Sequence, residues 1–401
     1  MIRTAAFALF IAFITASSAV AQRSLDLGVG GVGLSIGNSE RWSGLRINFR
    51  DRDVRRVNGI NLTLWEPHDN PDFVMNGIAT GLWSTDVGTL NGIGLGLGGV
   101  VANHDINGGA VAGLGIVAQG QINGVALAGL GVVSEGRIHG VAISGLGTVA
   151  QDGAYGVLIG GLGAVSQGSV HGVTIAGLGA VSQGDMIGLS IAGLGVVAQR
   201  SIVGLNIAGL GLVAERDLLG INIGGVGTVA QRDMRWVNIG GIGLVSNGNL
   251  EGLSMAGIAV VGTGRVRGIS IGGIAVVGVN GHDGIAIGGA GVVSEDGPLR
   301  GIALSAGRVD ALTADGIMVG GYRVKADEVR GLASSVLMLR TEDFDGIGIA
   351  PYTEVRGVQR GITIGIFNRA EELRGVQIGL LNYAGNNTGI FRWLPLINAH
   401  F

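Results

Sequence analysis

Residues 188–203 read GLSIAGLGVVAQRSIV, and close variants of this sixteen-residue unit follow one another along most of the chain. Each unit begins with a glycine, and the spacing stays at sixteen from Gly108 to Gly284, with Trp236 taking the leading position once. A strict period of this length predicts one small supersecondary element per unit, stacked on its neighbours. The repeat therefore predicts an architecture, and by itself it indicates no activity.

The positions within the unit indicate two strands and two turns. Counting from the leading glycine, positions 2 and 4 are aliphatic and position 3 is small or polar, as in Leu205, Asn206 and Ile207. This alternation is typical of a β-strand with one buried side. The Gly-Leu-Gly at positions 6–8 breaks the strand, a second strand centres on the valine at position 10, and a polar turn such as Gln183-Gly184 follows. We expect positions 2, 4, 7, 10 and 15 to face inward and position 3 to face outward.

Position 9 also faces outward on this assignment, and it is mostly aliphatic. An exposed apolar stripe larger than a few hundred Å² usually marks a partner, a membrane or self-association. The alternative is that position 9 turns inward with position 10 at a tight bend. The candidate interaction stripe consists of Ile116, Val132, Val196, Leu212, Leu244, Val260, Val276 and Val292.

Two architectures fit such a unit. In a parallel β-solenoid each unit is one coil, and identical positions stack about 4.8 Å apart. In an outer-membrane antiparallel β-barrel each unit is one strand with its turn, and alternate turns differ because the chain reverses at every strand. Consecutive turns here are alike. We therefore predict an all-β, repetitive parallel β-solenoid with 16-residue coils, and keep the barrel, which the terminal Phe401 favours, as the alternative.

The chain divides into a leader, an array and two ends. Arg3, an apolar stretch and Ala19-Val20-Ala21 resemble a secretory signal peptide. The ends of repeat arrays are atypical because their outer faces meet water. The predicted parts are a signal peptide at 1–21, an N-terminal cap with degenerate units at 22–91, the regular array at 92–300, looser repeats at 301–390 and a C-terminal cap at 391–401.

Composition excludes some classes of function. The chain has no cysteine, so it has no disulfide and no thiolate metal site. Its net charge of -3 gives no reason to expect nucleic acid as a partner. The mean hydropathy of +0.50 is high, but glycines interrupt every apolar run, so we assign this hydrophobicity to strands.

No motif assembles a reactive site. Residues 268–272 (GISIG) match a nucleophile elbow, but Ser270 occupies position 3 of its unit and no helix pattern follows. The glycines at 92–96 lack the βαβ context of a dinucleotide loop. His139 and His171 lie two units apart, about 10 Å in a solenoid, which is too far to bind one zinc ion. We expect no catalytic residue, no cofactor and no metal.

Residues 50–56 alternate arginines with Asp51 and Asp53. We interpret this group as a solvated cap whose charges pair with one another, with binding of an anionic surface ligand as the alternative.

Near the C-terminus, residues 361–368 (GITIGIFN) and 375–384 (GVQIGLLNYA) resemble units of a bacterial family named for its surface repeats. In that family a Gly-hydrophobic-Gln-hydrophobic-Gly-hydrophobic-hydrophobic-Asn unit recurs in secreted proteins. The match covers about the last forty residues and is looser over the central array, where Ala-Gly-Leu-Gly replaces the Gly-Leu-Leu-Asn portion. The resemblance implies export to the cell surface, outer membrane or periplasm, and it supplies no catalytic residues.

These observations predict an exported, non-enzymatic repeat protein that acts as a scaffold or interaction surface in the cell envelope. The alternative is an outer-membrane barrel that forms a pore. The partner is left open between an envelope component, a membrane and self-association through outward apolar columns.

Overall fold

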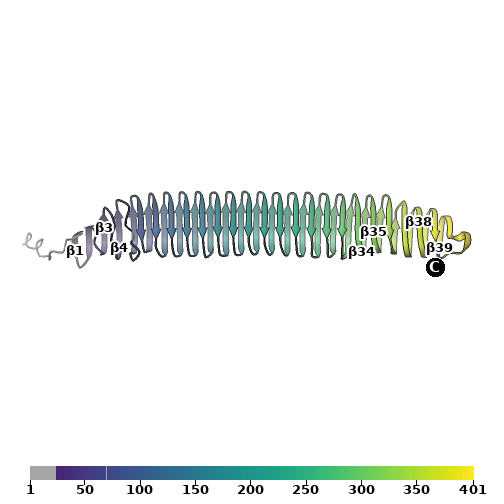
Figure 1. The fold of residues 1–401 in the computed structure, drawn as a ribbon, viewed down its shortest axis with the longest axis horizontal. Helices are drawn as coiled ribbons and strands as arrows, with labels where there is room; N and C mark the ends of the chain where they lie inside the picture. Colours follow the sequence, from purple (N-terminus) through teal and green to yellow (C-terminus); the bar gives the residue numbers. More distant parts are fainter. Residues whose placement is uncertain (1–23, 69) are drawn as a thin grey trace, which may run out of the picture. The chain divides into compact units, whose positions relative to one another are not determined.

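The computed structural model describes residues 24–68 and 70–401, which are nearly all β. They form a β-solenoid of about 20 coils with repeats of about sixteen residues, so the predicted fold class is confirmed. Packing contacts divide the chain into two units, the first ending at Ser144 and the second running from Gly145 to Phe401. Within each unit, strands of successive coils lie side by side (Figure 1). The predicted signal peptide, 1–21, lies outside the described residues.

One coil of the second unit shows how the repeat folds. The long strand β19 (Met186–Ala192) is followed by a turn, the short strand β20 (Gly195–Ala198) and a polar turn. β19 pairs in parallel with β21 (Ile202–Ala208), and β20 pairs in parallel with β22 (Gly211–Ala214). Identical positions therefore stack in columns, through the parallel pairing that a solenoid requires and an antiparallel barrel lacks.

The first unit begins with an antiparallel pair, β1 with β2, and continues with parallel pairs from β2 onward. Its strands are β1 (Ser24–Val29), β2 (Val32–Gly37), β3 (Arg41–Asn48), β4 (Arg56–Thr63), β5 (Val74–Gly81), β6 (Ser84–Val87), β7 (Thr89–Gly96), β8 (Gly99–Ala102), β9 (Ile106–Ala112), β10 (Gly115–Ala118), β11 (Ile122–Ala128), β12 (Gly131–Ser134) and β13 (Ile138–Ser144).

The second unit alternates short and long strands and ends with the antiparallel pair β38 and β39. Its further short strands are β14 (Gly147–Ala150), β16 (Gly163–Ser166), β18 (Gly179–Ser182), β24 (Gly227–Ala230), β26 (Gly243–Ser246), β28 (Ala259–Gly262), β30 (Ala275–Gly278) and β32 (Gly291–Ser294). Its further long strands are β15 (Ala154–Gly160), β17 (Val170–Ala176), β23 (Leu218–Gly224), β25 (Met234–Gly240), β27 (Leu250–Ala256), β29 (Val266–Gly272), β31 (His282–Gly288) and β33 (Pro298–Ser305). The last elements are β34 (Arg308–Gly320), β35 (Arg323–Ser335), β36 (Met338–Thr341), β37 (Asp343–Ile349), β38 (Tyr352–Ala384), the 3-10 helix η1 (Gly389–Arg392) and β39 (Trp393–His400). Over the described residues, no helix has the length and apolar character needed to cross a membrane.

The leading glycine allows neighbouring coils to approach closely. Gly188 has a φ of +123°, and a Cβ at this residue would lie 2.1 Å from the carbonyl oxygen of Gly172 in the preceding coil. Residues other than glycine rarely adopt such a φ, and no side chain fits that space. Leading glycines also stay opposite one another where the spacing changes, as in Gly44 with Gly59 and Gly284 with Gly301.

Trp236 is the one tryptophan in a leading position, with a φ of +86°. A non-glycine residue pays about 1–2 kcal/mol for left-handed backbone. We therefore expect Trp236→Gly to raise the free energy of unfolding by about 1 kcal/mol. The gain is at the lower end of this range because the greater freedom of glycine in the unfolded chain offsets part of it. Urea denaturation measures this change. Trp236→Ala keeps the Cβ and should give no such gain, and equal effects of the two variants would contradict a strained backbone.

The core of each coil consists of positions 3, 5, 9, 11 and 15. Val196 at position 9 and Ile202 at position 15 are fully buried, and the alanines at positions 5 and 11 fill the remaining space. Positions 2, 4, 7 and 10 face outward, as the exposed Leu205 and Leu194 illustrate. The prediction that positions 2, 4, 7 and 10 face inward and positions 3 and 9 outward is therefore wrong, whereas position 15 is buried as predicted.

The narrow cross-section of the coil is the reason. The two facing strands leave room for large side chains at positions 9 and 15 and for small ones elsewhere. A Cβ on Gly262 at position 11, for example, would lie 2.7 Å from Cγ2 of Val266 at position 15. The larger aliphatic residues at positions 2 and 4 therefore point outward. The strand period was predicted correctly, but a shift of one residue moves every side chain to the other face.

Polar residues enter this core because identical side chains stack and bond to one another. Asn206, Asn222 and Asn238, all at position 3, are fully buried. Asn206 Nδ2 donates to Asn222 Oδ1 at 2.9 Å, and Asn222 Nδ2 donates to Asn238 Oδ1 at 2.9 Å. Buried polar groups are stable when they are hydrogen-bonded, so this column tolerates asparagine where a single coil would not.

Removing the middle asparagine should therefore be costly. Asn222→Ala deprives Asn206 Nδ2 and Asn238 Oδ1 of their partners, and we expect a loss of about 2 kcal/mol in the free energy of unfolding. Chemical denaturation measures it. The matched control is Asn123→Ala, which removes the bond from Asn123 to Asn107 on a partly exposed column and should cost less than about 1 kcal/mol. Equal losses would show that burial of the asparagine column is unimportant.

Candidate interaction surfaces

The predicted interaction stripe lies in the core. Position 9 is on the inner side of the short strand, so the prediction that its side chains form a surface is wrong, whereas the next residue, at position 10, faces outward. The eight residues, each at most 1% exposed, are Ile116, Val132, Val196, Leu212, Leu244, Val260, Val276 and Val292.

The exposed apolar surface consists instead of positions 2, 4, 7 and 10. In the second unit, the position-7 leucines from Leu146 to Leu210 are 46–52% exposed and form one ridge at the turn. Positions 2 and 4 cover the outer side of the long strands, which we call the long-strand face. Position 10 covers the outer side of the short strands, the short-strand face. The aliphatic identity of these positions was the correct signal, but it marks the surface rather than the core.

Beside positions 2 and 4, position 16 carries alternating charges in eight coils of the second unit, from Arg235 to Asp345, and Arg360 follows Asp345 in the same column. The Glu251 carboxylate lies 3.4 Å from Arg235 Nε and 3.2 Å from Arg267 Nη1, and Arg300 Nε lies 3.7 Å from Asp315. Opposite charges on neighbouring strands stabilise a sheet modestly, by up to about 1 kcal/mol per exposed pair. We call this set the charged column: Arg235, Glu251, Arg267, Asp283, Arg300, Asp315, Arg330 and Asp345. This column was not predicted, although its charges are visible in the sequence when position 16 is compared from unit to unit.

In the first unit, position 16 carries asparagines that bond along the column. Asn76 Nδ2 donates to Asn58 at 2.7 Å, and the bonds continue through Asn91 and Asn107 to Asn123.

The long-strand face beside these asparagines holds an apolar groove of about 530 Å³. The groove is lined by Leu62, Leu64, Thr80, Gly81, Leu82, Leu95, Gly96, Leu97, Val111, Ala112 and Gly113.

Part of the arginine-rich N-terminal region is paired internally. Arg46 is fully buried, and its Nη1 donates to Asp51 and, at 2.6 Å, to Asn61 Oδ1. Burial raises the pKa of Asp51, but the positive charge of Arg46 and the hydroxyl of Thr63 outweigh it, so the pKa lies below its ordinary value. This buried pair holds the first coils together and is closed to ligands.

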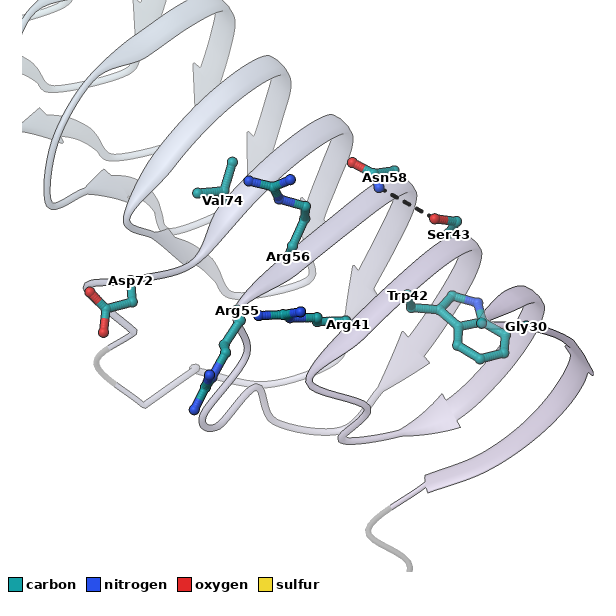
Figure 2. Close-up of a pocket in the computed structure, with 10 residues that line it drawn as sticks. Gly30, Arg41, Trp42, Ser43, Arg55, Arg56, Asn58, Asp72 and Val74 are labelled. Atoms are coloured by element: carbon teal, nitrogen blue, oxygen red, sulfur yellow. Dashed lines mark hydrogen bonds between the residues drawn. The ribbon is translucent and has the colours of Figure 1, made fainter.

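Three other arginines line an open pocket of about 530 Å³. Figure 2 shows Arg41, Arg55, Arg56 and Asp72 among the residues that line it. Arg41 and Arg56 lie directly opposite each other on β3 and β4, and Arg55 Nε is 3.7 Å from a Glu40 carboxylate oxygen. Among residues 24–68 and 70–401, no carboxylate forms an ion pair with Arg41 or Arg56. Of residues 50–56, Asp51 is buried against Arg46 and not solvated as predicted, and Arg55 pairs with Glu40 outside the group. The anionic ligand stays a prediction for the arginines of this group.

The residues considered for catalysis or metal binding do not converge. Ser270 is buried at position 3, and the Tyr155 and His171 rings stack with centroids 4.7 Å apart. In the described part of the chain, no group of three or more histidine or acidic side chains could hold a metal ion.

His282 is an unusual core residue that the sequence analysis did not single out. It occupies position 15, where the two adjacent coils place Val266 and Leu299, and both ring nitrogens are buried without a hydrogen-bond partner. Burial lowers its pKa to about 4, against the opposing effect of Asp283. A histidine between the aliphatic residues Val266 and Leu299 of this column was the available signal.

No protein-family model matches the chain, and no curated protein or solved structure is significantly similar to it. Neither an activity nor a partner is therefore transferred from a relative, and the resemblance to the surface-repeat family stays a prediction.

Proposed function

We propose that this chain is an exported, non-enzymatic structural protein of the cell envelope, and that its outward apolar columns form an interaction surface. The observation that carries the proposal is the repetition of exposed aliphatic residues at positions 2, 4 and 7 in coil after coil. Monomeric soluble proteins rarely expose continuous apolar patches beyond roughly 300–600 Å². A surface of this kind supports binding rather than catalysis, since it offers no acid, base or nucleophile.

Two further observations support the location. Residues 1–21 have the charge, apolar stretch and small-residue cleavage site of a signal peptide. The last forty residues resemble repeats of secreted bacterial proteins. Expression of the full chain in a bacterium with two membranes tests this part: the mature N-terminus should be Gln22, and the chain should leave the cytoplasm. A chain that keeps Met1 and stays in the cytoplasm contradicts export.

The interaction surface is tested by changing position 7 alone. Leu162→Gln, Leu178→Gln and Leu194→Gln together remove three exposed leucines from the ridge without changing the core. We expect the wild type to sediment with envelope fractions or as assemblies and the triple variant to remain in the supernatant with unchanged circular dichroism. The matched control replaces Gln167, Gln183 and Gln199 at the polar turns with alanine and should behave as the wild type. Equal sedimentation of all three proteins contradicts the proposal.

A further inference from the structure

We infer that the long-strand face of the second unit is self-complementary and binds a second copy of this chain in antiparallel orientation. The inference rests on the proposed function and names its partner. The surface consists of the charged column together with positions 2 and 4 of the same eight coils, from the coil of Trp236 to that of Gly346.

The order of charges carries the inference. A two-fold axis along the strand direction, between two stacked faces, keeps each position opposite itself and reverses the order of the coils. Placed between the coils of Asp283 and Arg300, this axis sets each of the eight charges from Arg235 to Asp345 opposite the reverse charge of the other copy, and Arg360 lies outside the paired set. The opposed pairs are Arg235 with Asp345, Glu251 with Arg330, Arg267 with Asp315, and Asp283 with Arg300.

The same two-fold rotation places the aliphatic residues of position 2, beside the charges, opposite aliphatic residues of the second copy. At position 2, Ile269 lies opposite Ile317 of the second copy, and both side chains are about two-fifths exposed in one chain, at 41% and 42%. The remaining position-2 pairs are Val237 with Ile347, Leu253 with Leu332, and Ile285 with Ile302. Aliphatic side chains of two such sheets interdigitate at a separation of about 10 Å.

The size of the face suits a dimer. Eight coils at about 4.8 Å each, and five residues at about 3.3 Å each, give roughly 600 Å² of flat surface per copy. Two copies bury roughly 1,200 Å² together, which is at the lower end of specific protein interfaces. The two copies also share the same coil spacing, so their side chains stay in step over all eight coils.

A second copy fits this face better than a lipid surface does. Pairing between neighbours already favours alternating charges within one chain, but it does not explain why exposed aliphatic columns accompany them. Lipid would cover the aliphatic residues while desolvating a row of charges with no new partners, which is costly. A second copy of the chain provides apolar contacts for the aliphatic residues and opposite charges for the charged column.

Sedimentation equilibrium of the mature chain tests the association. The variant carries Ile269→Lys and Ile317→Lys, which place two opposed pairs of like charges within the interface and leave the core of each copy unchanged. We expect a dimer for the wild type and at least a tenfold weaker self-association for the variant, with the same circular dichroism and thermal unfolding. The matched control carries Val181→Lys and Val245→Lys, two exposed positions on the short-strand face, and should still dimerise.

The orientation is tested with introduced cysteines, because the chain has none of its own. Val237→Cys and Ile347→Cys variants should be joined by a bifunctional maleimide that spans about 10 Å when they are mixed, and neither should be joined to itself, since its equivalents lie roughly 34 Å apart in the antiparallel dimer. Maleimide crosslinking of Val237→Cys alone would indicate parallel packing and overturn the inference.

Two other outcomes also overturn it. One is a wild type that is monomeric at all concentrations, or that dimerises equally well with both lysine pairs. The other is a monomer that floats with phosphatidylcholine–phosphatidylglycerol vesicles through this face, with flotation lost in the Ile269→Lys, Ile317→Lys variant. If the chain is monomeric but the position-7 leucine variant still loses its envelope association, the antiparallel dimer fails and the proposed function stands. If neither association is seen, both fail.

Discussion

Val196→Asp is expected to unfold its part of the array, whereas Val197→Asp, one residue later, should be nearly neutral. Val196 is fully buried between Ala180 and Leu212 of the adjacent coils, so aspartate there places an unpaired charge in the core. We expect a loss of about 4 kcal/mol or more in the free energy of unfolding. Val197 faces solvent, and the same change there should cost less than about 1 kcal/mol. Thermal and urea denaturation of the two variants measure the difference.

This pair of variants also has its controls within the same strand. Val196→Ala removes the side chain without adding charge and should cost less than the aspartate, by an amount set by the cavity that remains. Similar losses for Val196→Asp and Val197→Asp would mean that the inward and outward sides of the short strand are not those described above.

The stability of the chain is expected to fall between pH 6.5 and pH 4 because of His282. An unfolded histidine has a pKa near 6.5, whereas burial lowers that of His282 to about 4. Between these values the unfolded state binds a proton that the folded state does not, so stability decreases as the pH falls. Protonation of His282 in the unfolded state should lower the free energy of unfolding by about 3 kcal/mol between pH 6.5 and pH 4. It has no effect above pH 6.5, where His282 is neutral in both the folded and the unfolded state.

His282→Leu tests this directly. Leucine occupies the same position 15 in other coils, for example Leu218 and Leu250, and it leaves no buried nitrogen without a partner. We expect the variant to be more stable than the wild type at pH 7 by about 1–2 kcal/mol and to lose most of the acid sensitivity. His104→Gln, in an exposed turn, is the control and should keep the slope of stability against pH. An unchanged slope in His282→Leu would show that other groups cause the acid sensitivity.

The period of the array could be predicted from the sequence, but the side of each strand that is buried could not. Leading glycines, turn residues and the period of two together indicated parallel coils. The choice of side assumed that aliphatic residues are buried, so Leu205 and Ile207 were placed inside and Asn206 outside. In the structure Asn206 is inside and the two aliphatic residues are outside. Asn206 bonds to an identical residue in the next coil, and several of the inner positions have room only for small residues.

Contacts between coils escaped prediction for a related reason. The charged column becomes visible only when residues sixteen positions apart are compared, and its meaning depends on knowing that position 16 faces outward. The alanines at positions 5 and 11 were the sign of a narrow core, since a wide core would have been filled by larger side chains.

The constant pairing of leading glycines also bears on how such chains change over generations. Glycines fifteen, sixteen or seventeen residues apart still meet their counterparts, so the turns absorb small differences in length. Duplicating or deleting one whole coil in the gene would bring together two coils whose columns already match, with no new packing to be found. Related chains are then free to differ in the number of coils while each coil keeps its cross-section. Selection would adjust how many equivalent surface residues the chain presents without altering the surroundings of any one of them.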